Sequence, residues 1–262
     1  MSRLASCLVT QAQLESAPFQ DWARRLNQPP GLNRKTWEFC FIAQALTERG
    51  LVGPGKRGLG FAVGREPLPA LFAALGAQIV ATDVDRAHSE AAGFEPHDHA
   101  EGPADLVVAE LCAPDRMQQL VAFRNVDMNH VPEDLTGFDF AWSACAIEHL
   151  GSIERGLTFV ERMTRCLKPG GVAVHTTELN LSHADDTIDH APTVLFRDRD
   201  LAELERRLAR RGYRVRLDLS RGDGDADLTI VSPPYPFTPH LKLTFGRFVT
   251  TSLALIVEPV QP

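Results

Sequence analysis

The chain has 262 residues, of which 44% are hydrophobic and 23% are charged. This is ordinary globular usage, which excludes a disordered or fibrous chain, and a chain of this length buries enough surface to fold without disulfides. Lysine and arginine number 27 against 34 aspartates and glutamates, and the net charge of −7 argues against a general nucleic-acid-binding surface.

The cysteines and the apolar runs indicate a cellular compartment. Five cysteines occur without any CxxC spacing, and we expect reduced, buried thiols rather than disulfides or a zinc site: Cys7, Cys40, Cys112, Cys145 and Cys166. The apolar stretch Leu4–Val9 is too short for a signal peptide, and Leu253–Val257 is too short to span a membrane. The sequence therefore predicts a cytoplasmic protein without membrane insertion.

Residues 1–54 are expected to form an N-terminal helical extension. Residues 1–30 are polar and irregular, and they end in a loop signal, Pro29-Pro30-Gly31. Thr36–Arg49 carries aromatic and aliphatic residues at helical spacing and is followed by a terminating glycine.

A β-α-β unit comes next. Lys56–Gly64 indicates a strand that runs into a glycine-rich turn, and Pro67 is typical of a first helical turn. An apolar stripe continues the helix to Gly76, and Ile79–Asp83 indicates a second buried strand.

The remaining elements continue this alternation. Helices are expected near Arg86–Ala92 and Pro114–Val121 and over Ser152–Leu167. A further helix runs through Leu201, Leu204 and Leu208, with Asp200 as its N-cap and Gly212 at its end. Strands are expected to end at Asp127 and to cover Phe138–Ser143, Gly171–Thr176, Val215–Leu219 and Ser252–Glu258. Alternating strands and helices predict an α/β protein with a doubly wound, seven-stranded, mostly parallel sheet. Residues 55–262 would form this domain, with insertions on the acceptor side near 86–121, 178–197 and 220–250.

Ligands of such sheets bind at the carboxyl ends of the strands, so the residues that follow each strand are the candidates. Glycines at Gly60–Gly64 would let the backbone approach a ligand closely. Asp83 could accept hydrogen bonds from ribose hydroxyls, and Asp127-Met128 could hold a flat ring that carries an exocyclic amine. Ser143–His149 and Thr176–Asn180 follow the next two strands.

Over residues 55–258 the chain resembles a class I S-adenosylmethionine-dependent methyltransferase. The resemblance is carried by five pieces in order: Gly58–Gly64, Asp83, Asp127-Met128, Ile147-Glu148-His149-Leu150 and Arg165–Gly171. It implies S-adenosylmethionine as cofactor. It also implies roles for ten residues: Gly58, Gly60 and Gly64 under the methionine part, Asp83 and Val84 at the ribose, Asp127 and Met128 at the adenine, Ser143 and Ile147 near the sulfonium, and Glu66 beside the glycine-rich turn.

Two positions depart from the family's D/E-x-G-x-G-x-G pattern. Gly58 stands in place of the acid, and Ala62 stands in place of the middle glycine. The missing acid removes one contact to the methionine ammonium. Glu66 either replaces it or is an ordinary acid at a helix N-terminus.

A finer resemblance concerns the acceptor. Arg34–Glu38, Leu59–Pro69 and the stretch from Pro233 to Ser252 look like bacterial methyltransferases encoded near glycosyltransferases. This predicts transfer of a methyl group to a small-molecule or glycan acceptor, at a sugar hydroxyl. The alternatives are an N- or C-methyltransferase of another metabolite and a non-catalytic S-adenosylmethionine-binding module. No nucleic-acid partner is expected, and a homodimer is allowed for.

Methylation of a hydroxyl requires a group that removes its proton, and the candidates are His149, Glu178 and His183. Each has a plainer interpretation, as a wall or loop residue. The loop His183–His190 could bind a divalent metal or cover the substrate, and we expect no metal. His97-Asp98-His99 is interpreted as a solvated loop, and Trp37 as a core residue rather than a lid over the cofactor.

Overall fold

The computed structural model describes residues 3–87 and 99–260. The helices are α1 (Gln11–Glu15), α2 (Ala17–Arg25), α3 (Arg34–Thr47), α4 (Leu68–Ala74), α6 (Pro114–Leu120), α7 (Ile153–Met163), α8 (Asp198–Arg210) and α9 (Asp225–Leu228), with 3-10 turns η1 (Pro103–Leu106), η2 (Met128–His130), η3 (Ile147–His149) and η4 (Thr164–Cys166). The strands are β1 (Ser6–Leu8), β2 (Arg57–Gly60), β3 (Gln78–Asp83), β4 (Val121–Asn125), β5 (Phe138–Ser143), β6 (Leu167–Asn180), β7 (Tyr213–Arg214), β8 (Leu217–Asp218), β9 (Ile230–Val231), β10 (Lys242–Phe245) and β11 (Phe248–Pro259).

One sheet organises the chain. Its order is β4-β3-β2-β5-β6-β11-β1-β8, with β10 and β7 also paired to β11 and β9 paired to β10. The pairs from β4 through β6 are all parallel, and β11 runs antiparallel to β6. The predicted α/β fold with a mostly parallel sheet is confirmed. The described residues contribute eleven strands, however, not the seven expected.

The first strand explains part of this difference. Residues 1–30 were expected to be irregular, but β1 enters the sheet between β11 and β8. Cys7 pairs antiparallel with Ala254 and parallel with Asp218. A three-residue strand shows too little alternation to be recognised in a sequence, and α1 and α2 follow it directly.

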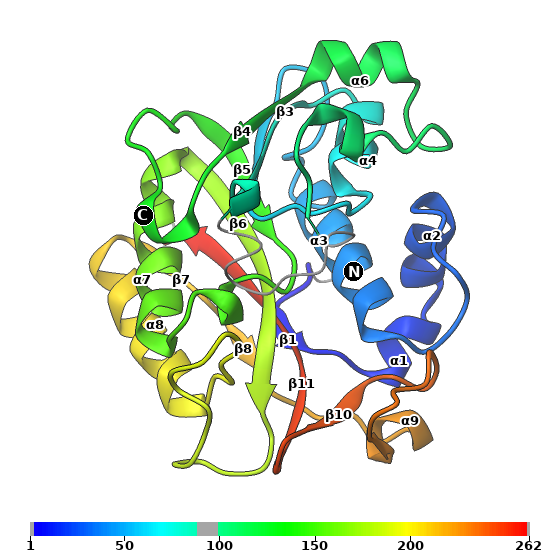
Figure 1. The fold of residues 1–262 in the computed structure, drawn as a ribbon, viewed down its shortest axis with the longest axis vertical. Coiled ribbons are helices and arrows are strands. Elements are labelled where there is room, and N and C mark those ends of the chain that lie inside the picture. Colours follow the sequence, from blue (N-terminus) through cyan, green and yellow to red (C-terminus); the bar gives the residue numbers. More distant parts are fainter. Residues whose placement is uncertain (1–2, 88–98, 261–262) are drawn as a thin grey trace.

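Helices cover both faces of the sheet (Figure 1). One core cluster lies between the sheet and helices α1, α2, α3, α4 and α6, and it contains Trp37, Phe41 and Phe72. The second joins α7 and α8 to the opposite face, and it contains Phe159 and Leu204. Trp37 is fully buried, as its interpretation as a core residue predicts. Among the described helices, none is long and apolar enough to cross a membrane.

Several element boundaries differ from the prediction. The N-cap of α8 is Arg197, and Asp200 is instead the third residue of the helix, where its carboxylate accepts from the Arg197 backbone N–H at 2.9 Å. Helix α7 stops at Met163 because the chain turns through η4 into β6 at Leu167. Of the strand expected over residues 215–219 only residues 217–218 form a strand, β8, and a separate short strand, β7, precedes it. The helix expected near residues 86–92 lies largely outside the described residues.

Candidate active site

A cavity of about 670 Å³ opens where β2, β3 and β5 end. Parallel strands place the residues that follow them along one edge of the sheet, which is where ligands of doubly wound sheets bind. The lining residues come from the α3 region, the turn after β2 and the segments after β3, β4 and β5, and they are Gln28, Lys35, Phe39, Ala62, Val63, Gly64, Arg65, Glu66, Pro67, Asp83, Val84, His99, Asp127, Met128, Asn129, Ala144, Cys145, Ala146, His149 and Leu150.

The glycines of β2 are packed closely against neighbouring side chains. Gly58 and Gly60 lie inside β2 and do not line the cavity. A Cβ at Gly60 would lie 2.5 Å from the Trp142 ring, closer than any real contact allows. The floor of the cavity is instead the turn Ala62–Gly64, where Ala62 and Gly64 adopt left-handed φ of 47° and 50°.

Asp83 lies on the cavity wall at the end of β3, where a ribose-binding acid was predicted. Its Oδ2 accepts from the backbone N–H groups of Gly64 (3.1 Å) and Ala100 (3.2 Å), and its Oδ1 accepts from Val84 N–H (2.8 Å). Burial raises the pKa of this carboxyl, and the three N–H donors and His99 oppose the rise. Among the described contacts Oδ1 has one donor, so it can still accept from ligand hydroxyls.

His99 corrects one interpretation. It was expected in a solvated loop, but it is 6% exposed, lines the cavity and lies 3.5 Å from Asp83 Oδ2. His97 and Asp98 lie outside the described residues. The polar neighbours of His99 in the sequence gave no signal that this position returns to the sheet edge.

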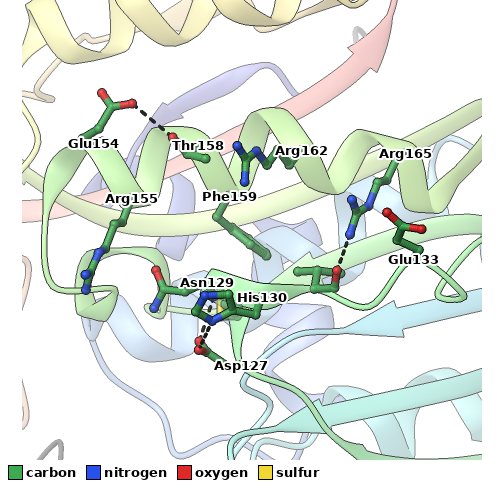
Figure 2. Close-up of a pocket in the computed structure, with 12 residues that line it drawn as sticks. Asp127, Asn129, His130, Glu133, Glu154, Arg155, Thr158, Phe159, Arg162 and Arg165 are labelled. Atoms are coloured by element: carbon green, nitrogen blue, oxygen red, sulfur yellow. Dashed lines mark hydrogen bonds and ion pairs between the residues drawn. The ribbon is translucent and has the colours of Figure 1, made fainter.

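Asp127 and Met128 form the wall after β4, as predicted. Asp127 accepts from Asn129 N–H and from His130 Nδ1, both at 2.8 Å. Burial raises the pKa of Asp127, but these hydrogen bonds outweigh it and leave the pKa below its usual value. The same turn borders a second cavity of about 510 Å³ that extends toward Arg155, Arg162 and the rest of α7 (Figure 2).

The segment after β5 contributes different residues from those expected. Ser143 and Ile147 were expected near the sulfonium, but both are buried in the protein interior and neither lines the cavity. The Ser143 hydroxyl bonds to His175 Nδ1 at 2.8 Å. Their neighbours Ala144 to Ala146 line the cavity instead, because Cys145 adopts a left-handed φ of 53° and turns the chain along the wall.

His149 lies on the cavity wall in a defined orientation. Its Nδ1 lies 3.0 Å from the Pro192 carbonyl oxygen and 3.2 Å from the Thr193 hydroxyl. A carbonyl oxygen can only accept, so Nδ1 carries a proton and donates it to Pro192. This hydrogen bond fixes the orientation of the imidazole on the cavity wall.

Glu178 and His183, the other two candidate bases, have different surroundings. Glu178 is buried, and its two oxygens accept from Arg34 Nη2 (2.5 Å) and the Thr250 hydroxyl (2.6 Å). Burial raises the pKa of Glu178, but Arg34, Thr250 and Lys35 together outweigh burial and hold the pKa below its usual value. A carboxylate in this state is a poor base and serves to position Arg34. His183 is exposed, packs against Phe248 and does not line the cavity.

The loop that was considered for metal binding carries acids that pair with arginines. On the loop after β6, Asp185 pairs with Arg199 and Asp186 with Arg247. Within the described residues, one group of potential metal ligands lies close together, formed by Cys145, Glu148 and Glu178 with ligand atoms within 4.8 Å of one another. Because Arg34 and Thr250 already occupy the oxygens of Glu178, we assign no metal to this group.

Two charged lining residues complete the cavity. Lys35 was not predicted as a site residue, because the sequence of a helix does not show which cavity its first turn reaches. Glu66 is only 8% exposed and accepts from Trp142 Nε1 at 2.5 Å, so it is not an ordinary solvated acid at a helix N-terminus.

The comparisons with known proteins agree with this geometry. Residues 59–175 match a family model described as a methyltransferase domain. A candidate methyltransferase from Bacillus halodurans C-125 is 12% identical, covers 84% of this chain and 99% of its own, and has a TM-score of 0.51. The structure of the CcbJ methyltransferase from Streptomyces caelestis is 13% identical with a TM-score of 0.49, and the pair covers 90% of this chain and 92% of that one. Burkholderia thailandensis 1,6-didemethyltoxoflavin-N1-methyltransferase is 16% identical, covers 96% of this chain and 82% of its own, and has a TM-score of 0.49. No curated protein matches.

Residues 59–175 therefore match a methyltransferase domain, and the fold is the Rossmann-like fold of such domains. The activity that this match indicates is S-adenosylmethionine-dependent methyl transfer, with S-adenosylmethionine as the cofactor. The residues fit this cofactor, because Asp83 and Met128 lie where a nucleoside needs an acid and a flat contact, and charged groups of both signs lie beyond the glycine-rich turn.

Proposed function

We propose that the enzyme methylates a hydroxyl group of a sugar or glycan acceptor. The cofactor supplies a methyl group that is already activated for in-line displacement, so the protein has to orient the acceptor and remove its proton. The observation that carries the proposal is His149, with Nδ1 held by a carbonyl and the ring on the cavity wall. A hydroxyl needs such a base far more than a neutral amine does.

His149 has neighbours suited to general-base catalysis. It follows β5 directly in η3, beside Cys145 and Ala146 on the cavity wall. The adjacent Glu148 is fully buried, and burial raises the pKa of its carboxyl while the His149 ring opposes the rise. A nearby carboxylate stabilises the imidazolium that forms when the ring takes a proton.

The lining around His149 suits a sugar. Phe39 and Leu150 offer apolar surface, while Gln28 and Lys35 offer hydrogen-bond donors. A sugar ring presents C–H faces and hydroxyl groups together, so it needs both kinds of contact.

A labelled-methyl assay tests the proposal. Purified enzyme would be incubated with methyl-labelled S-adenosylmethionine and separate pools of nucleotide sugars, glycans, amines, RNA and protein. We expect label in a sugar or glycan as an O-methyl ether. His149→Gln should lower kcat by roughly 100-fold or more, the range for loss of a general base, without changing the affinity for S-adenosylhomocysteine.

The matched control is His190→Gln, which alters a histidine whose side chain is 79% exposed and outside the cavity. Its kcat should equal that of the wild type. Label found only on a nitrogen or carbon atom, or full activity of His149→Gln, would refute the hydroxyl proposal.

We further place the reaction in the cytoplasm. All five cysteines are free thiols, and Cys40, Cys112 and Cys166 are buried. Burial raises the pKa of all three thiols, that of Cys40 to about 12 and that of Cys166 to about 11. Unpaired cysteines are typical of a reducing compartment. Residues 55–262 would form the catalytic domain, with β1 of the N-terminal segment completing its sheet.

A further inference from the structure

The position of the family's missing acid is closed in this protein. A Cβ at Gly58 would lie 2.4 Å from the Phe140 ring and 2.9 Å from Ile79. Contacts this short do not occur in proteins, and the Phe140 ring is fully buried, so it has little room to shift. The contact that the acid makes elsewhere in the family must come from another residue here, or be lost.

The aromatic residues that close this position also hold Glu66. Phe140 and Trp142 stack at 5.8 Å on one face of β5, and Trp142 lies across the strand at Gly60. From there its indole N–H donates to Glu66 Oε1 at 2.5 Å. The same two aromatic rings therefore require glycine in β2 and, through Trp142, hold Glu66 in place.

Glu66 is a buried acid at the cavity wall without a salt bridge among the described residues. The charged groups that face it are Lys35 and Glu38 from α3 and Asp83 from the end of β3. Burial raises the pKa of Glu66 to about 8, against the Trp142 hydrogen bond and Lys35, which lower it, and with Asp83 and Glu38, which add to the rise. In the free protein at neutral pH, this carboxyl is mostly protonated.

Lys35 supplies a positive charge on the same cavity wall. The Asn33 side chain caps α3 by accepting from the Lys35 backbone N–H at 2.8 Å, and the Lys35 ammonium lies 3.1 Å from Glu38. Its side chain is 49% exposed, toward a cavity that it lines. Arg65, which also lines the cavity, likewise has an acid partner, Asp105, at 3.1 Å.

The amino-acid end of the cofactor is a zwitterion, with one ammonium and one carboxylate, and Glu66 and Lys35 offer the complementary pair. We propose that Glu66 replaces the family's strand-end acid as the ammonium partner, that Lys35 binds the carboxylate, and that Glu66 releases its proton to solvent when the cofactor binds. The balance is simple. The carboxylic acid becomes a carboxylate, the ammonium keeps its charge, and one proton enters the buffer. The inference rests on the cofactor and not on the acceptor of the proposed function.

Calorimetric titration with S-adenosylhomocysteine between pH 6 and 8, in two buffers of different ionisation enthalpy, tests this. Because the free protein must lose a proton to bind, affinity should rise with pH, roughly tenfold per unit between pH 6 and 7. Close to one proton should be released per ligand in that range. Methylthioadenosine lacks the amino-acid end and should bind with no such pH dependence, although it meets Asp83 and His99 equally.

Two variants complete the test. Glu66→Gln should abolish the proton release and weaken binding of S-adenosylhomocysteine at pH 8 by roughly tenfold, the effect of losing one charge-assisted hydrogen bond. Lys35→Met should weaken it by a similar factor while it retains the pH slope. Neither variant should change the affinity for methylthioadenosine.

The results separate this inference from the rest. The inference about Glu66 is overturned if the wild type binds S-adenosylhomocysteine equally well at every pH, or if Glu66→Gln behaves as the wild type. Either result leaves the proposal of methyl transfer to a hydroxyl intact. Methyl transfer to another atom, with the expected proton release, would refute only the proposed acceptor. If neither nucleoside binds, the inference fails together with the cofactor site.

Discussion

The two ends of the cofactor cavity differ in how far they follow the family pattern. At the ribose end, Asp83 stands at the end of β3, where the pattern places an acid, and three backbone N–H groups fix it. At the methionine end, Gly58 occupies the acid position, and the acid on the cavity wall is Glu66, which we propose takes its place. An acid that backbone N–H groups hold, such as Asp83, must stand at one position after the strand. An acid that a side chain such as Trp142 holds can be supplied from a different position in the sequence.

The largest effect is expected when an acid is placed back in β2, at Gly58. Gly58→Asp should lower the free energy of unfolding by more than about 3 kcal/mol, because the new side chain overlaps the Phe140 ring and buries a charge. Urea denaturation measures it. Gly102→Asp is the matched control, with no atom within 4 Å of its Cβ, and should stay within about 0.5 kcal/mol. A stable Gly58→Asp protein with improved cofactor affinity would show that the original position is still usable.

The ribose end should respond through affinity. Asp83→Ala should weaken S-adenosylhomocysteine and methylthioadenosine alike, by about 2 to 3 kcal/mol, since both ligands carry the ribose. Calorimetry of the two ligands gives the comparison, and Asp134→Ala, which alters an exposed carboxylate paired with Arg124, is the control. Unchanged affinity in Asp83→Ala would remove this residue from the ribose site.

The smallest effect concerns the turn that joins the two ends. Ala62 adopts a left-handed φ of 47°, where the family has glycine. Ala62→Gly should raise the free energy of unfolding by about 0.5 kcal/mol, as relief of strain exceeds the greater chain entropy of glycine. Ala74→Gly, in the regular helix α4, should instead lower it by about 0.5 to 1 kcal/mol. If both variants lose stability equally, the turn is not strained.

The sequence predicted the parts of the molecule that follow from local pattern. Hydrophobic runs and glycines located the parallel strands from β2 to β6, and the residues after β3 and β4 placed Asp83 and Asp127 at the cavity. Contributions that depend on long-range contacts were not predictable. Lys35 reaches the cavity from an N-terminal helix, and β1 finds its partners at the far end of the chain.

The side chains after β5 show the same limit at closer range. Ser143 and Ile147 were assigned to the pocket from their place after the strand, but the left-handed residue Cys145 reverses which neighbours face inward. A backbone angle at one residue has no signature in the sequence when the residue is not glycine. His149 was correctly placed after the strand, yet its orientation depends on Pro192, a loop residue far along the chain.

The place of β1 between β11 and β8 sets the order in which the protein can be completed as it is made. Cys7 pairs with Asp218 and Ala254, so its partners leave the ribosome roughly 10 to 50 s later at ordinary translation rates. Until then the first strand has no native neighbour, and closing so long a loop costs entropy that only the finished sheet repays. The native sheet therefore closes as a late step of biosynthesis, after the last strand has emerged.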